Sequence, residues 1–248
     1  MPAPIISVTY PIFSHRDPCT AYLSDPMFLK HGIIKNKLIN PKVIFMHTED
    51  AHEREVKFFI DDPQRISAQL KHVGALIEKK RVHEYNLRFD TPDQNLKQNH
   101  RVLRLRKDSA FHLTYKGASD STAEVADREE LEVTVSDFDT TRSILERLGF
   151  QPFMIYEKYR TTFTYKECEI VLDQLPFGYF IEIEGSSVSE IKETAADLGL
   201  EWEKRITASY LELFQNIKRN TKLHAQNILF AEFTGMNFTE DNFTFPER

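Results

Sequence analysis

Charged and apolar residues alternate with a period of two in several segments of this chain. In the run Glu53-Arg54-Glu55-Val56-Lys57, a β-strand would place Glu53, Glu55 and Lys57 on one face. Later segments repeat the pattern with pairs of like charge, at Arg104 and Arg106, Glu130 and Glu132, Lys158 and Arg160, and Glu182 and Glu184. Apolar residues occupy the opposite faces at Val56, Leu103, Leu105, Leu131, Val133, Ile181 and Ile183. We therefore expect strands that bury one face and gather charge on the other, around a cavity suited to a polyanion and its metal counterions.

Period-two segments bounded by turn residues predict the strands of this fold. We expect them at about 53–60, 82–90, 101–107, 110–117, 128–135, 156–165, 168–174 and 179–185. Asp108-Ser109 and Lys166-Glu167 are interpreted as the turns of two hairpins. Residues 51–219 would form the folded domain, with residues 1–50 as an irregular N-terminal extension and residues 220–248 as a C-terminal extension packed on the domain.

Helices are predicted between the strands by cap residues and an apolar period of 3.6. Asp62 and Pro63 supply an N-terminus for a helix that should continue to about Lys80. Its apolar stripe is Ile66, Leu70, Val73 and Ile77. Asp137 should open a helix to about Leu148, ended by Gly149. Two more helices are expected at about 187–198 and 205–219, where Tyr210 is interpreted as a packing residue.

Composition narrows the class of protein. The chain has 248 residues and 41% hydrophobic content, enough for a substantial core. Its formal net charge of -6 argues against a nucleic-acid coat, which would be basic. Only Cys19 and Cys168 occur, so neither a disulfide framework nor a zinc-ligand spacing is present, and a cytoplasmic location is expected. No apolar run approaches the length of about 18 residues that a membrane span requires, so no membrane partner is expected.

Eight short motifs in order carry a resemblance to a known family. They are EREVK at 53–57, FDTPD at 89–93, LRLR at 103–106, LTYKG at 113–117, REELE at 128–132, EKYR at 157–160, LD at 172–173 and FIEIE at 180–184. With these motifs, residues 53–215 resemble the CYTH superfamily, the triphosphate tunnel metalloenzymes. Its members include class IV adenylate cyclases, thiamine triphosphatases and inorganic triphosphatases. The chain departs from the pattern at Arg88, where many members have an aromatic residue, and this leaves the choice of substrate open.

The resemblance implies a fold and a site. The expected fold is α+β, a closed antiparallel eight-stranded β-barrel flanked by helices, whose polar lumen holds a triphosphate and a divalent metal. Arginine and lysine match the oxygens of a triphosphate with charge-assisted hydrogen bonds. The candidates for substrate binding are Lys57, Arg104, Arg106, Lys116, Lys158 and Arg160, of which Lys57, Arg104 and Arg106 are also the catalytic candidates. Arg128 is as well explained by a structural pairing with Glu130 and Glu132.

Carboxylates on the same predicted faces are candidate metal ligands. Mg²⁺ or Mn²⁺ prefers carboxylate, water and phosphate oxygens. The candidates are Glu53, Glu55, Glu130, Glu132, Asp173, Glu182 and Glu184. They are too many to bind one ion directly, so some would neutralise the cations of the lumen when substrate is absent.

These patterns predict a metal-dependent triphosphatase. Water would attack the terminal phosphoryl group of inorganic triphosphate or of a small organic triphosphate. The first alternative is an adenylate cyclase of the same fold, which makes cyclic AMP and diphosphate from ATP. The second is a non-catalytic module that binds polyphosphate or nucleotides. The expected partner is the small-molecule substrate alone, with the chain a monomer or a homodimer.

Overall fold

The structure is a computed structural model that describes residues 52–119 and 123–243. The chain divides into two units, Met1–Ile44 and Phe45–Arg248, and every described residue belongs to the second. The predicted N-terminal extension of residues 1–50 lies outside the described residues. None of the described helices is long and apolar enough to cross a membrane.

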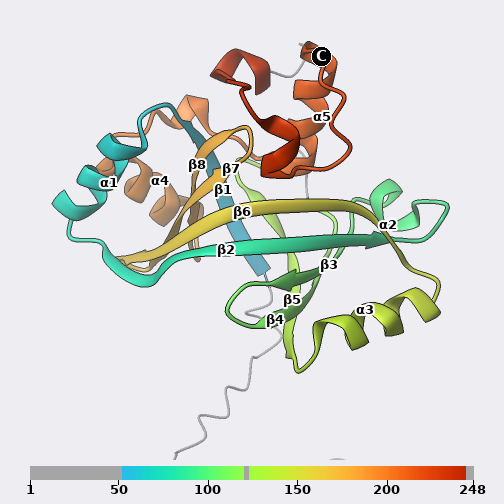
Figure 1. Ribbon diagram of the computed structural model, residues 1–248. Helices are drawn as coiled ribbons and strands as arrows, with labels where there is room; N and C mark the ends of the chain where they lie inside the picture. Colours follow the sequence, from blue (N-terminus) through green and yellow to red (C-terminus); the bar gives the residue numbers. More distant parts are fainter. Residues whose placement is uncertain (1–51, 120–122, 244–248) are drawn as a thin grey trace, which may run out of the picture. The chain divides into compact units, whose positions relative to one another are not determined.

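Eight antiparallel strands form a closed barrel in the described part of the chain. In barrel order the neighbours are β1-β5-β4-β3-β2-β6-β7-β8, and the ring closes because β1 pairs with both β5 and β8. The strands are β1 (His52–Ile60), β2 (Leu76–Asp90), β3 (Val102–Lys107), β4 (Phe111–Lys116), β5 (Ala126–Val135), β6 (Gln151–Tyr165), β7 (Cys168–Leu175) and β8 (Gly178–Glu184). In Figure 1 the two longest strands, β2 and β6, run side by side. The expected α+β fold with a closed eight-stranded barrel is confirmed.

Helices cover the outer face of the barrel in separate clusters. The α-helices are α1 (Pro63–His72), α2 (Asn95–Gln98), α3 (Phe138–Arg147), α4 (Val188–Asp197) and α5 (Tyr210–Asn220). Helices α1 and α4 lie together in Figure 1 and pack Ile66, Leu70 and Ile191 against β1, β7 and β8. Helix α3 packs Leu145 against β2 and β3.

Helix α5 forms a third cluster with the chain that follows it. Leu213, Phe214 and Ile217 of α5 are fully buried with Phe177 and Phe180. Three 3₁₀-helices, η1 (Trp202–Lys204), η2 (Phe230–Phe233) and η3 (Glu240–Phe243), complete the described elements. Phe233 and Phe243, from η2 and η3, belong to the same cluster, so the described residues after α5 are packed on the barrel.

The first helix is shorter than the sequence predicted. Helix α1 begins at Pro63, with the Asp62 side chain accepting a hydrogen bond from the Arg65 backbone, but it ends at His72 and not near Lys80. Gly74 follows with φ of +82°, a left-handed conformation that stops a helix. Strand β2 then starts at Leu76 and pairs with β6, so Ile77 is 57% exposed and is not part of the apolar stripe.

One predicted apolar face is not buried. Leu131 and Val133 alternate with charged residues on β5 as expected, yet they are 52% and 59% exposed. Helix α3 packs against Val135 at the end of β5, but none of the three clusters of described residues includes Leu131 or Val133. The alternation therefore predicted correctly that Leu131 and Val133 lie on the outward side of β5. It could not predict whether a helix would cover that side and bury them.

The turn before β8 generates a stability prediction. Gly178 has φ of +145°, and a Cβ atom there would lie 2.8 Å from Cε2 of Phe59. The Phe59 ring is held by Phe180 and Phe243, at centroid distances of 5.5 and 4.9 Å. We expect Gly178→Ala to lower the free energy of unfolding by the left-handed strain of about 1–2 kcal/mol plus an overpacking cost of about 1–3 kcal/mol.

Gly149→Ala is the matched control, because Gly149 also has a positive φ, +93°, but no atom lies within 4 Å of the added Cβ. Urea denaturation of both variants measures the difference. Equal losses of stability would mean that the Phe59 ring yields to the new methyl group.

Candidate functional site

The barrel encloses a charged cavity of about 870 Å³. Side chains from all eight strands line it, because alternate residues of each strand point inward. All the predicted site residues except Asp173 are among the lining residues, and the buried Asp173 bonds directly to two of them. The strands thus bring together charged pairs that are up to about 130 positions apart in the sequence, from Glu53 to Glu184.

Lys57 of β1 is a buried cation held between two carboxylates. Its Nζ donates to Glu55 at 2.6 Å and lies 3.5 Å from Glu182 of β8. Burial alone would lower the pKa of Lys57, but the Glu55 and Glu182 carboxylates outweigh it and raise the pKa to about 12. Lys57 is therefore fully protonated at neutral pH and presents a fixed positive charge to the lumen.

A second cluster forms around Asp173 of β7, which is fully buried. Lys158 Nζ donates to its Oδ2 at 2.9 Å, and Arg160 donates from Nε to Oδ1 at 2.8 Å and from Nη2 to Oδ2 at 2.6 Å. The Tyr210 hydroxyl of α5 donates to the same Oδ2 at 3.0 Å. Asp173 accepts all four hydrogen bonds, and these contacts orient the Lys158 and Arg160 side chains.

The opposite wall repeats this pairing. Lys116 Nζ lies 2.6 Å from both Glu53 and Glu130. Arg106 Nη2 donates to Glu132 at 3.1 Å, and Arg104 Nη2 lies 3.4 Å from the same carboxylate. Burial opposes ionisation of Glu132, but the two arginines, with a hydrogen bond from Thr114, hold its pKa below the ordinary value.

Arg128 of β5 also joins the lumen network. It contacts Glu53 at 3.4 Å and Glu55 at 3.3 Å. Its ion-pair partners are thus on β1, and not the Glu130 and Glu132 carboxylates of its own strand that the sequence suggested. Strand pairing explains the difference, since Arg128 is the direct partner of Glu53 across the β1–β5 ladder.

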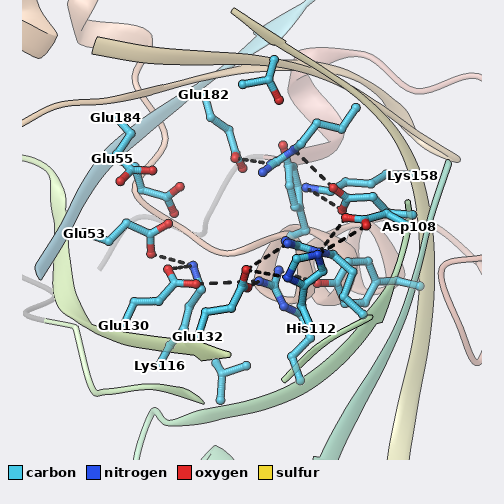
Figure 2. Close-up of a pocket in the computed structure, with 18 of the residues that line it drawn as sticks. Glu53, Glu55, Asp108, His112, Lys116, Glu130, Glu132, Lys158, Glu182 and Glu184 are labelled. Atoms are coloured by element: carbon cyan, nitrogen blue, oxygen red, sulfur yellow. Dashed lines mark hydrogen bonds and ion pairs between the residues drawn. The ribbon is translucent and has the colours of Figure 1, made fainter. Parts of the chain in front are cut away.

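Glu53, Glu55 and Glu184 gather on one side of the lumen, across from Lys158 and Asp108 (Figure 2). Glu184 of β8 pairs in register with Glu55 of β1 and with Glu169 of β7. No ion pair or hydrogen bond to the Glu184 carboxylate occurs among residues 52–119 and 123–243. Burial, followed by the nearby Glu53, Glu169 and Glu55 carboxylates, raises the pKa of Glu184 to about 8. This wall therefore carries more negative charge than its cations neutralise.

The side of the lumen formed by Glu53, Glu55 and Glu184 carries the type of ligand that a hard divalent cation prefers. Carboxylate oxygens are the ligands that Mg²⁺ and Mn²⁺ prefer, and an ion would relieve the repulsion that raises the pKa of Glu184. In the conformation of the described residues, no three His, Cys, Asp or Glu side chains already surround one ion position.

The structure adds lumen residues that the sequence patterns did not single out. Glu84 of β2 is buried beside Lys158 and Arg160, whose charges outweigh its burial and lower its pKa to about 2. His112 of β4 lies 3.1 Å from Glu132 and 3.4 Å from Asp108 (Figure 2). Glu84 and His112 each occupy the inward alternation of their strand, but each lacks a charged partner two positions away, so no repeated pair marked them.

Tyr210 is the packing residue that the sequence predicts, but it also has a polar contact inside the lumen. Its ring packs edge-on against Phe180 at a centroid distance of 5.3 Å, while its hydroxyl enters the lumen and bonds to Asp173. The helical period identified the buried side of α5 correctly. Only the position of α5 relative to the barrel placed the hydroxyl within reach of Asp173.

Comparisons with known proteins agree with this architecture. The family model described as CYTH domain matches residues 51–212. A protein of Methanocaldococcus jannaschii that carries an adenylate cyclase name is 31% identical over 173 residues, which are 65% of this chain and 97% of that protein.

Solved structures share the fold. One from Vibrio parahaemolyticus, also named as an adenylate cyclase, has a TM-score of 0.59 at 22% identity, covering 66% of this chain and 97% of its own. One from Hippeastrum has a TM-score of 0.51 at 19% identity, covering 66% and 95%. That protein is described as an adenylyl cyclase with a dominant triphosphatase activity.

The raised pKa of Glu184 generates a prediction for the metal-free protein. Its carboxyl binds a proton more tightly when folded, with a pKa of about 8 against an ordinary value of 4.5. This contribution to stability is complete below about pH 4.5 and is lost as the pH rises through 8. We expect the unfolding free energy of Glu184→Gln, relative to wild type, to increase steadily from pH 5 to pH 8.

Denaturant unfolding in the presence of EDTA measures this difference. Glu167→Gln is the control, because Glu167 is an exposed turn residue outside the lumen. A pH-independent difference for Glu184→Gln would contradict the predicted crowding of carboxylates.

Proposed function

Because this chain belongs to the CYTH domain family, we propose that it is a metal-dependent triphosphatase that hydrolyses inorganic triphosphate or a small organic triphosphate inside the barrel. One observation carries the proposal. Buried or half-buried cations converge on one enclosed cavity from five strands, at Lys57, Arg104, Arg106, Lys116, Arg128, Lys158 and Arg160. Such a concentration of positive charge in a closed lumen matches a compact polyanion.

The cations would bind and orient the phosphate chain. Arg104 and Arg106 present planar guanidinium groups that suit phosphate oxygens, and Lys57 adds a charge held in place by Glu55 and Glu182. As the terminal phosphoryl group transfers to water, these fixed cations stabilise the charge on the diphosphate leaving group and on the equatorial oxygens. The protein contributes position and charge, which is most of what phosphoryl transfer requires.

A divalent cation would complete the site. We assign it to the side of the lumen where Glu53, Glu55 and Glu184 meet, with Glu182 adjacent. Mg²⁺ or Mn²⁺ there would neutralise phosphate charge that the arginines and lysines do not reach. In this assignment Glu130, Glu132 and Asp173 chiefly orient the lysines and arginines with which they pair. Glu53 and Glu55 also pair with cations, but they lie beside Glu184, which has no ion pair among the described residues.

The partner we propose is the substrate alone, with the chain acting as a monomer or homodimer in the cytoplasm. An adenylate cyclase is the second candidate, supported by the name of the M. jannaschii relative and by the apolar lining residues Met154, Leu211 and Ile228, which a purine could contact. The Hippeastrum protein indicates that a cyclase name within this fold does not exclude triphosphatase activity. A non-catalytic anion-binding module is the weakest candidate, because acidic walls would oppose anion binding without a metal.

A substrate panel tests the proposal. Purified protein with Mg²⁺ or Mn²⁺ is given inorganic triphosphate, thiamine triphosphate or ATP, and phosphate, diphosphate and cyclic AMP are quantified. We expect kcat/KM for phosphate release from inorganic triphosphate to exceed that for cyclic AMP formation from ATP. Dominant cyclic AMP production would select the cyclase, and binding without turnover of any substrate would select the anion-binding module.

Arg106 provides a test at the level of one side chain. Arg106→Ala should lower kcat/KM for triphosphate by a factor corresponding to about 2–3 kcal/mol, because a charged donor to the phosphate is lost. The exposed Arg101 lies five residues earlier, and Arg101→Ala is the matched control for the change in net charge. Wild-type turnover by a folded Arg106→Ala protein would contradict the proposal that Arg106 binds the phosphate chain.

A further inference from the structure

Arg88 is a lumen cation that the proposed reaction leaves without a role. It lies on the inward face of β2 with Glu84 and Asn86, and it lines the cavity. Its direct partners across the sheet are Arg104 of β3 and Met154 of β6. Its guanidinium carbon lies 5.7 Å from the centre of the Phe153 ring. Arg88 therefore places a third arginine beside Arg106 and Arg104, on the neighbouring strand β2.

The charge of Arg88 is not compensated within the described part of the chain. The seven cations assigned to the triphosphate each pair with at least one carboxylate, whereas Arg88 forms no ion pair with a residue in 52–119 or 123–243. Its Nε is buried and has no hydrogen-bond partner there. Burial lowers the pKa of Arg88. Tyr156 and the Glu212 carboxylate act in the opposite direction, but together with the positive charges of Arg128 and Arg104 burial prevails.

Asn86 beside it shows the same lack of partners. It is 0% exposed, and neither its amide nitrogen nor its amide oxygen has a hydrogen-bond partner among the described residues. Asn86 pairs across the sheet with Arg106 on one side and Tyr156 on the other. Buried polar groups are nearly always satisfied, so the unsatisfied Nε of Arg88 in the cavity lining, with the unsatisfied Asn86 amide buried behind that lining, points to a ligand position beside Arg88.

We propose that Arg88, with Asn86 behind it, forms a subsite for a fourth phosphoryl group, so that the preferred substrate is a linear tetraphosphate rather than a triphosphate. This inference rests on the proposed function, since it places the ligand in the same lumen. Same-face neighbours on adjacent strands have Cβ atoms about 5 Å apart, so a chain held by Arg104 can continue directly to Arg88.

An anion fits this position better than a nucleobase does. A half-buried guanidinium that forms no ion pair is costly, and a phosphate supplies the direct ion-pair partner that no described carboxylate provides. A base would leave the charge unpaired, although its ring could stack on the guanidinium plane. The adjacent Arg104 and Arg128 make the local potential more positive, which also favours the anion.

The experiment compares inorganic triphosphate with inorganic tetraphosphate on the full chain. For wild type and Arg88→Gln, kcat/KM is measured with Mg²⁺, and the rise in melting temperature caused by each anion is measured with Ca²⁺ in place of Mg²⁺. Because a lost charged hydrogen bond corresponds to a factor of roughly 10 to 100, we expect Arg88→Gln to lower kcat/KM for tetraphosphate by about that much, and by a smaller factor for triphosphate. The extra thermal stabilisation by tetraphosphate should disappear with it.

Two further variants sharpen the comparison. Arg88→Lys keeps the charge and should retain part of the preference for tetraphosphate, while Arg101→Gln removes an exposed arginine and should retain all of it. Without ligand, Arg88→Gln should melt at or above the wild-type temperature, because it removes a half-buried charge that has no ion-pair partner. A large fall in melting temperature would indicate a structural role and overturn the proposal.

The outcomes separate this inference from the proposed function. Equal losses on both anions, or no loss on tetraphosphate, would overturn the tetraphosphate subsite while leaving the proposed hydrolysis intact. If wild type turns over neither anion but tetraphosphate still stabilises it through Arg88, the subsite stands and the hydrolase assignment fails. If neither anion binds, both fail.

Discussion

The structure depends on charge compensation inside a closed barrel. Closing the ring between β1 and β8 places inward side chains from eight strands in one enclosed space, where an unpaired charge costs several kcal/mol. Lysines and arginines are therefore interleaved with carboxylates from neighbouring strands, as at Lys57 with Glu55 and Glu182. The barrel can hold so many ions because the strand registers set opposite charges across from each other at most positions, as at Lys57 and Glu182 or Lys116 and Glu130.

The outer face carries the folding free energy that this interior does not supply. Fully buried aliphatic residues such as Val56, Ile181 and Ile183 alternate with the lumen charges and pack beneath α1 and α4. Each strand in that region is thus a two-sided element, apolar outside and ionic inside. The ionic interior is consequently free to be arranged for a ligand, while the helices outside determine whether the strand remains in place.

Charge compensation is incomplete at two places in the lumen, one with excess negative charge and one with excess positive charge. Around Glu184, burial and then the neighbouring Glu53, Glu169 and Glu55 carboxylates raise the pKa of that group to about 8. Around Arg88 a guanidinium has no carboxylate partner among the described residues. A cation is the natural occupant of the first place and an anion of the second. A metal-bound phosphate chain supplies both charges, which is why one ligand can satisfy opposite deficits in the same lumen.

The sequence by itself determined the order of the eight strands along the chain, their inward faces and the charged pairs, because a period of two fixes the side of a strand on which each residue lies. It also located the caps at Asp62 and Asp137. It missed the first residues of β2 and β6, where the alternation is weak. Tertiary structure alone decided which charges meet, since pairing depends on strand order and register. It put Arg128 against Glu53, brought the Tyr210 hydroxyl to Asp173 and left Leu131 exposed. Local periodicity specifies direction, but partners come from elements distant in sequence, and only the closed barrel sets those distances.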